Sequence, residues 1–325
     1  MPCRLDKHLF THYALPFLLF SLFSLALFYN LFSNLENQGL RLGFSFLTQE
    51  AGFEIGDKFF FSYESTQSYL HAFLIGLSNT VMSSILIIFF STLLGFILGL
   101  LRFSSLKLYS LFASFYSNIF RNIPLVIQLY FFYHILINYL PSARESYNFF
   151  GLDLFFLNNR GLFIPRFGLT DFSFSYPVLE GFNYFGGSHF TPELIVLVFG
   201  SSLYAAAFIS EIVLAGLKAI PGGQLEAARS LGMSERNCFS KIIFPQSVKI
   251  IIPPLTNQWP SIIKNSSLAV AIGYPDLLSV VNTGLNQTGK AIECLSLIIL
   301  VYLLLSLVSS FFLNYIAKKF QYKNE

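Results

Sequence analysis

Six apolar segments, several of them long enough to cross a bilayer, constrain the fold of this chain more than any other feature. They lie near residues 14–33, 72–101, 124–140, 193–217, 248–273 and 291–317. A membrane-spanning helix needs roughly 20 mainly apolar residues. Only 11% of the residues are charged, whereas about a quarter are charged in a typical soluble domain. The sequence therefore predicts an all-α integral membrane protein with six transmembrane helices.

The first apolar run is predicted to be a retained anchor helix. Arg4 and Lys7 precede it, as in a signal peptide, but the run is longer than a signal sequence needs and no small-residue cleavage site follows it. His8 and His12 are four residues apart, which is one requirement of a metal site. No glutamate follows His8, so the zinc pattern fails and we interpret both histidines as residues flanking the membrane.

Basic residues orient the segments, because loops rich in Lys and Arg stay on the cytoplasmic side. One set of alternating loops carries thirteen of them: Arg4, Lys7, Arg102, Lys107, Arg121, Lys218, Arg229, Arg236, Lys241, Lys249, Lys318, Lys319 and Lys323. The other set carries six: Arg41, Lys58, Arg144, Arg160, Arg166 and Lys290. Both termini and the 218–249 loop are therefore predicted to be cytoplasmic. The net charge of +3 is too small to suggest a nucleic-acid partner.

These assignments divide the chain into four regions. We expect a cytoplasmic end with the anchor helix at 1–35, an outer (periplasmic) segment at 36–70, a core transmembrane domain at 73–313 and a cytoplasmic tail at 314–325. Within the core, 141–191 is an outer insertion and 218–249 a cytoplasmic loop. Both outer segments are too aromatic for disordered linkers, so they are expected to fold as caps on the helices. An amphipathic stretch at 108–121 predicts a short interfacial helix before a span that begins at Pro124.

The 218–249 loop is a polar island between two apolar segments. Its punctuation predicts two short helices. Pro221 suits a first helical turn and Gly232 suits the left-handed position that ends a helix. Ser234 is a good N-cap for a second helix, which Pro245 should close. A compact unit with alanines on its surface would let a partner protein approach closely.

The order of residues in this loop is more specific than its composition. Glu226-Ala227-Ala228 is followed after three residues by Gly232, and after nine more by Ile242-Ile243-Phe244-Pro245. This series resembles the EAA motif of the permease subunits of ABC importers, with Phe244 in place of a leucine. The resemblance implies that the loop couples the permease to a separate ATPase. It assigns that role to Glu226, Ala227, Ala228, Gly232 and Pro245.

Longer strings extend the resemblance over most of the chain. Residues 120–133, 209–234 and 253–293 are similar to polar amino-acid permeases, and residues 51–55 and 157–165 to the larger general L-amino-acid permease subunits. The resemblance implies the type I ABC importer transmembrane fold with a cytoplasmic coupling helix. It also implies ATPase subunits, an identical or homologous second permease, a periplasmic amino-acid-binding protein and a location in the bacterial inner membrane. An ATP-independent amino-acid transporter or channel is the alternative.

The sequence predicts neither an enzyme nor a nucleotide site in this chain. Gly284 to Ala291 comes within one residue of a phosphate loop, but Ala291 stands where that loop needs a hydroxyl for magnesium. ATP and magnesium would therefore bind to the partner ATPase. The histidines at 71, 134 and 189 are isolated, and Cys3, Cys238 and Cys294 have no metal-ligand spacing.

Two polar clusters interrupt the predicted spans, where an ionised side chain costs at least ~2.5–3.5 kcal/mol. Glu211 is expected to pair with Arg121 as a structural clamp, with contact to the substrate as the other interpretation. The candidate residues of the transport path are Lys264, Asn265, Ser266 and Asn257. Helix packing through small and polar residues is the competing interpretation of this second cluster.

Overall fold

The computed structural model describes residues 7–37, 42–59, 61–148, 154–167 and 174–322. The chain forms two compact units, Met1–Phe46 and Leu47–Glu325. The first unit contains one long helix, α1 (Lys7–Asn37), which includes both N-terminal histidines. Its large apolar side chains from Leu15 to Tyr29 are mostly exposed, as expected of a helix that is surrounded by hydrocarbon. Cys3 lies outside the described residues.

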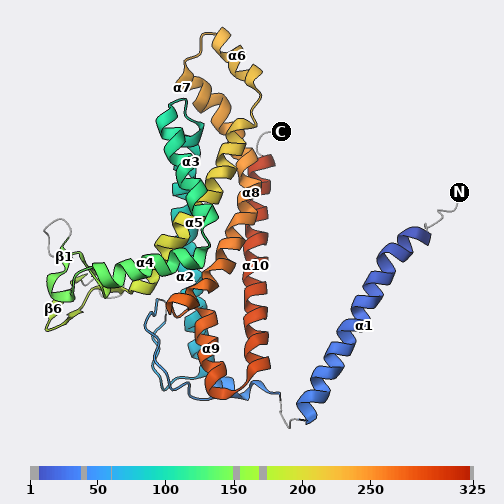
Figure 1. Cartoon of the computed structure of the whole chain (residues 1–325), viewed down its shortest axis with the longest axis vertical. Helices are drawn as coiled ribbons and strands as arrows, with labels where there is room; N and C mark the ends of the chain where they lie inside the picture. The colour runs from blue at the N-terminus through green and yellow to red at the C-terminus, as the bar shows by residue number, and fades with distance from the viewer. Residues whose placement is uncertain (1–6, 38–41, 60, 149–153, 168–173, 323–325) are drawn as a thin grey trace. The chain divides into compact units, whose positions relative to one another are not determined.

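The second unit is a helical bundle built on α2 (Tyr69–Phe103) and α5 (Pro192–Lys218), which run side by side in the same direction (Figure 1). The other helices of the bundle are α3 (Lys107–Asn122), α4 (Leu125–Tyr139), α8 (Phe244–Asn265), α9 (Leu277–Thr288) and α10 (Ala291–Tyr322). Buried residues of α4, α5 and α8 form one continuous apolar core, which includes Leu129, Ile209 and Ile251.

Glycines allow α2 and α5 to pack closely. A Cβ atom on Gly95 would lie 2.6 Å from Cβ of Ile209, and one on Gly99 would lie 2.5 Å from Cβ of Val213. Both distances are shorter than a side chain tolerates. Because lipid tails are as apolar as leucine, membrane helices associate through close backbone packing at small residues rather than through the hydrophobic effect. This contact fixes the position of α2 relative to α5.

Three described helices are long and apolar enough to cross a membrane on their own, namely α2, α5 and Ala291–Tyr315 within α10. Two bent pairs raise the number to five if each pair is one span. The helices α3 and α4 meet at 103°, and Glu235–Ile272 meets α9 at 52°. With 15 residues, α4 is only about 22 Å long, so the predicted span at 124–140 is too short to cross a bilayer alone. Six spans stay a prediction.

The amphipathic stretch before Pro124 folds as α3, but its packing face is not its apolar face. Ala113 and Ser117 are buried against the bundle, and the Tyr116 hydroxyl donates to the carbonyl of Leu203 at 2.9 Å. The large side chains of Phe112 and Phe115 are exposed. The helix lies along α2 and α5 with small residues inward, an arrangement suited to lipid on its outer side.

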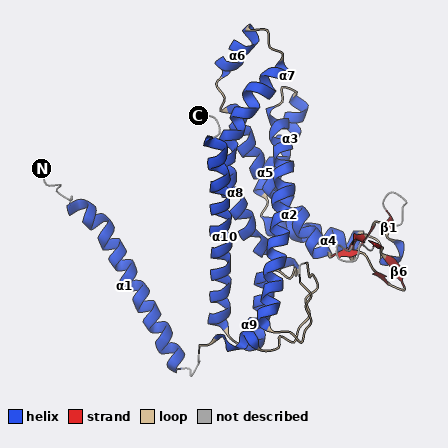
Figure 2. Ribbon diagram, turned by 180° about the vertical axis from the view of Figure 1, so that it is seen from behind, coloured by secondary structure: helices blue, strands red, loops and turns tan. Residues whose placement is uncertain are grey.

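The all-α prediction is wrong for the 141–191 insertion, which is largely β-structure (Figure 2). After a 3-10 turn, η2 (Ala143–Glu145), its strands are β1 (Tyr147–Asn148), β2 (Phe156–Asn158), β3 (Gly161–Ile164), β4 (Arg166–Phe167), β5 (Phe174–Ser175), β6 (Val178–Glu180), β7 (Asn183–Phe185) and β8 (Ser188–Phe190). They form an antiparallel sheet in the order β1-β2-β3-β8, with Leu157 opposite Leu162, and two hairpins, β4–β5 and β6–β7. Aromatic residues, which the sequence has at high density here, favour strands.

An irregular segment precedes the bundle and covers one end of it. It follows a 3-10 turn, η1 (Phe44–Thr48), and contains the buried residues Ala51, Ile55, Asp57 and Tyr63. The side-chain amide of Asn79 in α2 donates to the carbonyl oxygens of Asp57 and Pro275, both at 2.9 Å. These bonds tie the segment to α2 and to the turn that precedes α9. The segment is therefore folded, as its aromatic content predicts.

Candidate coupling and transport sites

The polar loop forms α6 (Gly222–Ser230) and α7 (Glu235–Cys238), followed by a π-helical turn, η3 (Phe239–Ile243). Pro221 is the N-cap of α6 and Ser234 that of α7. Gly232 separates the two helices with φ +79°, a left-handed conformation that glycine adopts without steric cost. Gly232 and Ser234 are thus at their predicted positions, whereas Pro221 precedes the first turn of α6 instead of lying in it.

Pro245 does not close the second helix, contrary to the prediction. It lies in the first turn of α8, where a missing backbone N–H costs nothing. The chain enters α8 through the wide turn η3, in which the N–H of Phe244 bonds to the carbonyl of Phe239. The loop is therefore continuous with α8, so a displacement of α6 and α7 has a helical route into the bundle.

Two polar contacts brace the α6–α7 unit. Arg229 donates to both carboxylate oxygens of Glu235, at 2.7 and 3.1 Å, and the amide of Gln246 in α8 donates to Gln224 in α6 at 2.7 Å. The hydrogen bonds from Arg229 lower the pKa of Glu235 below its ordinary value. The unit therefore has a defined shape.

The α6–α7 unit presents only some of its predicted coupling residues. Glu226, Ala227 and Gly232 are exposed, whereas Ala228 is buried against the rest of the loop. The prediction that both alanines lie on the surface is therefore wrong for Ala228. Leu231 is 83% exposed, which the sequence analysis did not single out. Its isolation within a polar loop is the signal that would have identified it.

The structure brings Glu211 and Arg121 together and adds a third member. Oε1 of Glu211 lies 2.7 Å from Nη1 of Arg121 and 2.9 Å from Nη1 of Arg102. Arg102 also donates to the hydroxyl of Ser210, which is 2.8 Å from the hydroxyl of Ser117. This cluster joins α2, α3 and α5. Arg102 was not predicted as a member of this cluster, because it stands at the end of its apolar run. A basic residue at that position is already explained by the excess of Lys and Arg in cytoplasmic loops.

The four candidate path residues do not share one environment. Asn257 and Lys264 are exposed on α8, Asn265 is half-buried, and Ser266 is buried in η4 (Ser266–Ile272). The Ser266 hydroxyl donates to the carbonyl of Ile263 at 2.8 Å and lies 3.5 Å from the hydroxyl of Ser84 in α2. The Ser266 side chain therefore packs between helices. The exposed polar side chains of α8 lie on the other side of that helix.

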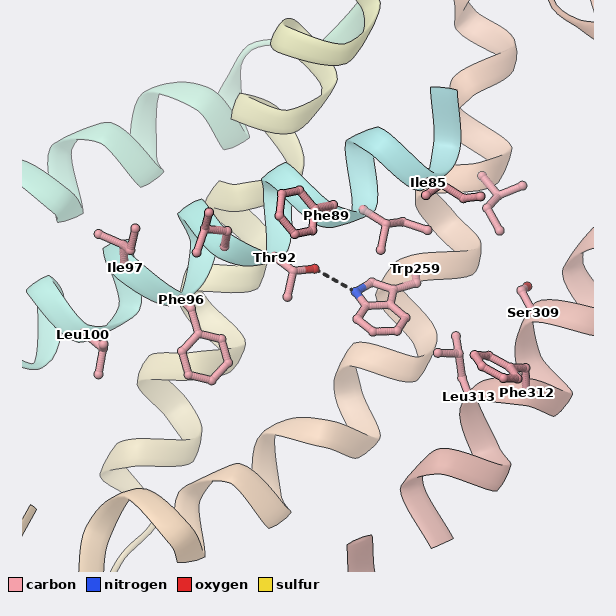
Figure 3. A pocket seen from close by; sticks show the side chains of 13 residues that line it. Ile85, Phe89, Thr92, Phe96, Ile97, Leu100, Trp259, Ser309, Phe312 and Leu313 are labelled. Carbon is pink, nitrogen blue, oxygen red and sulfur yellow. Dashed lines mark hydrogen bonds between the residues drawn. The ribbon is translucent and has the colours of Figure 1, made fainter. Parts of the chain in front are cut away.

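An apolar groove lies beside this surface, between α2, α8 and α10. Its cavity of about 840 Å³ is lined by residues such as Phe89 and Phe312. Trp259 is the only tryptophan of the chain, and its indole N–H donates to the Thr92 hydroxyl at 3.1 Å across the groove (Figure 3). This bond satisfies two polar groups in an apolar wall and joins α8 to α2.

A polar cavity of about 320 Å³ lies at the opposite end of α5 from α6. Asp57 and Glu193 contribute carboxylates to its wall. The Thr191 hydroxyl, at the N-cap of α5, donates to Oδ2 of Asp57 at 2.7 Å, and the Tyr133 hydroxyl donates to Glu193 at 2.8 Å. Burial raises the pKa of Asp57 to about 6, and the hydrogen bond from Thr191 offsets part of this shift.

The described residues contain no group of three or more His, Cys, Asp or Glu side chains that could hold a metal ion. Gly284 to Thr288, the first part of the phosphate-loop-like stretch, lie in the last turns of α9, with Gly289 as its C-cap. A phosphate loop instead follows a strand and opens a helix. The geometry of this stretch thus differs from that of a nucleotide site.

Comparison with known proteins identifies the family. Residues 91–322 match the family described as binding-protein-dependent transport system inner membrane component. The chain belongs to this family. It is therefore a multi-pass inner membrane component, and in this family the ATPase is a separate protein. The membrane permease fold with a mostly helical core agrees with the resemblance that the sequence shows.

Relatives identify the permease as a subunit of an amino-acid ABC importer. It is 38% identical to the putative amino-acid ABC transporter permease protein YhdX of Escherichia coli (strain K12), over 89% of this chain and 88% of that protein. It is 34% identical to the general L-amino acid transport system permease protein AapQ of Rhizobium johnstonii, over 88% of this chain and 85% of that protein.

Solved structures agree with this assignment. A crystal structure of an amino acid ABC transporter with histidines matches with a TM-score of 0.56 and 27% identity, over 77% of this chain and 95% of that chain. The MetNI methionine ABC transporter matches with a TM-score of 0.53 at 18% identity, which shows the fold alone. An ATP-independent transporter would be expected to have inverted repeats or paired broken helices, and neither is evident in the sequence. The structure has two bent helix pairs, but the family assignment decides for the importer.

Proposed function

We propose that α6 is the coupling helix through which a separate ATPase acts on this permease. The supporting observation is the placement of α6 and the 141–191 insertion at opposite ends of α5. With 27 residues, α5 is about 40 Å long, which exceeds the ~30 Å hydrocarbon core of a bilayer. The two regions would therefore lie on opposite sides of the membrane, and the basic loops assign α6 to the cytoplasm.

The surface of α6 suits a docking role. Glu226, Ala227 and Leu231 are exposed, while Ala228 and the Gln224–Gln246 bond hold the helix to the protein. A small residue beside an exposed leucine allows close approach and offers an apolar anchor. A push on α6 would then pass through η3 into α8 instead of deforming a flexible loop.

The transport path is proposed to follow the exposed side of α8. Asn257, Ser261 and Lys264 lie at helical spacing and are all exposed in the isolated chain. Polar side chains on one side of a membrane helix need protein or water as neighbours, because lipid cannot satisfy them. This surface would meet a second permease subunit, identical or homologous, with the path between them. Asn265 borders the path, whereas Ser266 supports its wall.

The resulting mechanism is alternating access. A periplasmic binding protein delivers an amino acid to the outer side, where the 36–70 segment and the 141–191 insertion would lie. ATP and magnesium bind to the ATPase subunits, whose closure moves α6 in each permease half. The paired permeases then open inward. In this scheme the chain crosses the membrane six times, both termini are cytoplasmic, and 314–325 is a cytoplasmic tail.

Two variants that add the same charge test the coupling assignment. We expect Leu231→Asp to abolish co-purification of the ATPase with the membrane-inserted permease, because a carboxylate would be desolvated in the docking contact. Ser105→Asp, in the exposed α2–α3 turn at the same end of the bundle, should retain the ATPase. Deletion of residues 224–232 should also remove the ATPase and leave membrane insertion intact. Normal ATPase recovery with both Leu231→Asp and the deletion would refute the proposal.

A further inference from the structure

A small cavity with several polar side chains in its wall lies between α10 and the junction of α8 with η4. It measures about 280 Å³ and is lined by Lys264, Ser267, Tyr302, Leu303 and Ser306. Lys264 is 20 residues beyond Phe244, about 30 Å along α8, and Tyr302 is 11 residues into α10, about 17 Å from its start. Lys264 lies in the last turn of α8, beside η4, whereas Tyr302 is well inside the candidate membrane span Ala291–Tyr315 of α10, which places the cavity at membrane depth.

The positive charge of Lys264 has no carboxylate within 4.0 Å in the part of the chain that the structure describes. Asp276 is the acidic residue linked to the cavity wall, and both of its oxygens accept hydrogen bonds from groups other than Lys264. Oδ1 accepts from the N–H of Ser279 at 2.8 Å, and Oδ2 accepts from the Tyr302 hydroxyl at 3.2 Å. An ammonium group at membrane depth is costly without a counter-charge. The cavity therefore lacks an anion.

Two further observations indicate a ligand. The Ser306 Oγ atom is buried and has no hydrogen-bond partner among the described residues, although buried hydroxyls are normally paired. The backbone also changes from α8 to the 3-10 helix η4 directly after Asn265. At membrane depth, irregular backbone is tolerated where it is packed in protein or lines a cavity. An unpaired cation, an unpaired hydroxyl and a helix break thus meet in one place.

We propose that this cavity binds the carboxylate group of the amino acid in transit. The ammonium of Lys264 supplies the counter-charge and the hydroxyl of Ser306 donates a hydrogen bond. This inference rests on the proposed path along α8. The α-carboxylate is shared by all L-amino acids, so a site for it would serve a permease whatever side chain the binding protein selects. The volume is close to the lower end of ligand pockets, roughly 300–1,000 Å³, as expected for so small a ligand.

A protection experiment tests the site directly. In the complete importer, with Cys3, Cys238 and Cys294 of this chain replaced by alanine, Ser306→Cys is labelled by a small thiosulfonate. L-Glutamine, which has a single carboxylate, is expected to slow labelling at least about threefold, whereas L-glutaminamide has no effect. Ser309→Cys, which lines the separate apolar groove on α10, is the matched control and should show no protection. Equal labelling of Ser306→Cys with and without L-glutamine would overturn the proposal.

Transport provides the second test. In proteoliposomes with the binding protein saturated by L-glutamine, Lys264→Met should lower uptake at least about tenfold, the usual weight of a lost hydrogen bond to a charged group. Lys264→Arg should keep uptake within about threefold, and Lys318→Met should match the unchanged protein. Undiminished uptake by Lys264→Met would contradict the proposal. Labelling of Ser306→Cys that changes with the phosphatidylglycerol content of the membrane but not with L-glutamine would also contradict it. ATPase assembly is measured separately, so failure here leaves the coupling assignment intact.

Discussion

Glu211 and Lys264 are both charged residues in apolar helices, yet their surroundings are opposite. Glu211 contacts two guanidinium groups, those of Arg102 and Arg121, and links three helices. Lys264 lines a cavity and has no carboxylate within ion-pair distance in the described ranges. The cost of a charge in the bilayer is therefore met inside the chain at one site and left open at the other.

The difference separates a structural charge from a functional one. A residue that is paired within its own subunit contributes to the packed state and needs no further ligand. A residue without a partner requires one from outside, and in a transporter the cargo is the partner that comes and goes. By this criterion we expect Glu211 to act as a clamp and Lys264 to belong to the proposed transport site, although both look alike in the sequence.

The largest expected effect is the loss of Glu211. Glu211→Gln leaves Arg102 and Arg121 facing each other without a counter-charge. Breaking a fully buried ion pair typically costs ~3–5 kcal/mol. The cost here should lie below that range, because the Glu211 side chain is 35% exposed. Arg102→Gln should cost less, and Arg121→Gln least, because the Arg102 side chain is 10% exposed and that of Arg121 38%. Thermal unfolding of the purified importer measures the order.

The cluster also predicts the result of a charge swap. Exchange of Glu211 and Arg121 would restore that pair but place Arg102 beside a new arginine. The double variant is therefore expected to be less stable than the unchanged protein, and rescue should require Arg102→Gln as a third change. Equal stability of Glu211→Gln and the unchanged protein would show that the cluster is not a clamp, and the comparison with Lys264 would fail.

Local signals in the sequence located much of the α6–α7 unit. Gly232 and Ser234 predicted where α6 ends and α7 begins, and Pro221 predicted the start of α6 to within one residue, because their backbone preferences depend on few neighbours. Pro245 misled the prediction, since a proline both ends one helix and suits the first turn of the next. Tertiary packing alone decided between these two options.

Long-range packing could not be predicted in the same way. The partnership of Arg102 with Glu211 depends on the close α2–α5 contact at Gly99, and no local pattern sets that register. The strands of the 141–191 insertion were missed because they are short and follow an apolar, aromatic composition that also fits packed loops. The burial of Ser266 on the side of η4 away from Lys264 required the three-dimensional structure.

Asp57 extends the comparison to a buried acid outside the predicted spans. Its pKa is raised to about 6 from an ordinary value of 3.8, chiefly by burial. The folded state therefore binds this proton more tightly than the unfolded state. Asp57 therefore contributes its full stabilisation below about pH 4, and this stabilisation is lost as the pH rises through 6. The loss in the free energy of unfolding amounts to about 3 kcal/mol at most. We expect the thermal midpoint of the unchanged protein to fall between pH 4.5 and 7.5.

Asp57→Asn should remove this part of the pH dependence. The Asp57 carboxylate becomes neutral when it binds a proton, so it needs no external counter-charge. Glu54→Gln is the matched control, because Glu54 is exposed and Lys58 lowers its pKa. Loss of the Glu54 carboxylate would change the pH dependence of the thermal midpoint weakly and in the opposite sense. Identical pH profiles for Asp57→Asn and the unchanged protein would mean that Asp57 is solvated in the assembled importer.

The smallest effect is expected for the exposed ion pair of the coupling region. Arg229 and Glu235 form two hydrogen bonds, but both side chains are largely in water, where ion pairs contribute little. Arg229→Gln should leave the thermal midpoint and ATPase co-purification unchanged. Gly232→Ala should lower both, because its φ of +79° is strained for a residue with a Cβ atom. If Arg229→Gln instead released the ATPase, this ion pair would be part of the docking contact. An exposed charge would then be functional for the same reason as Lys264, because its partner belongs to another molecule.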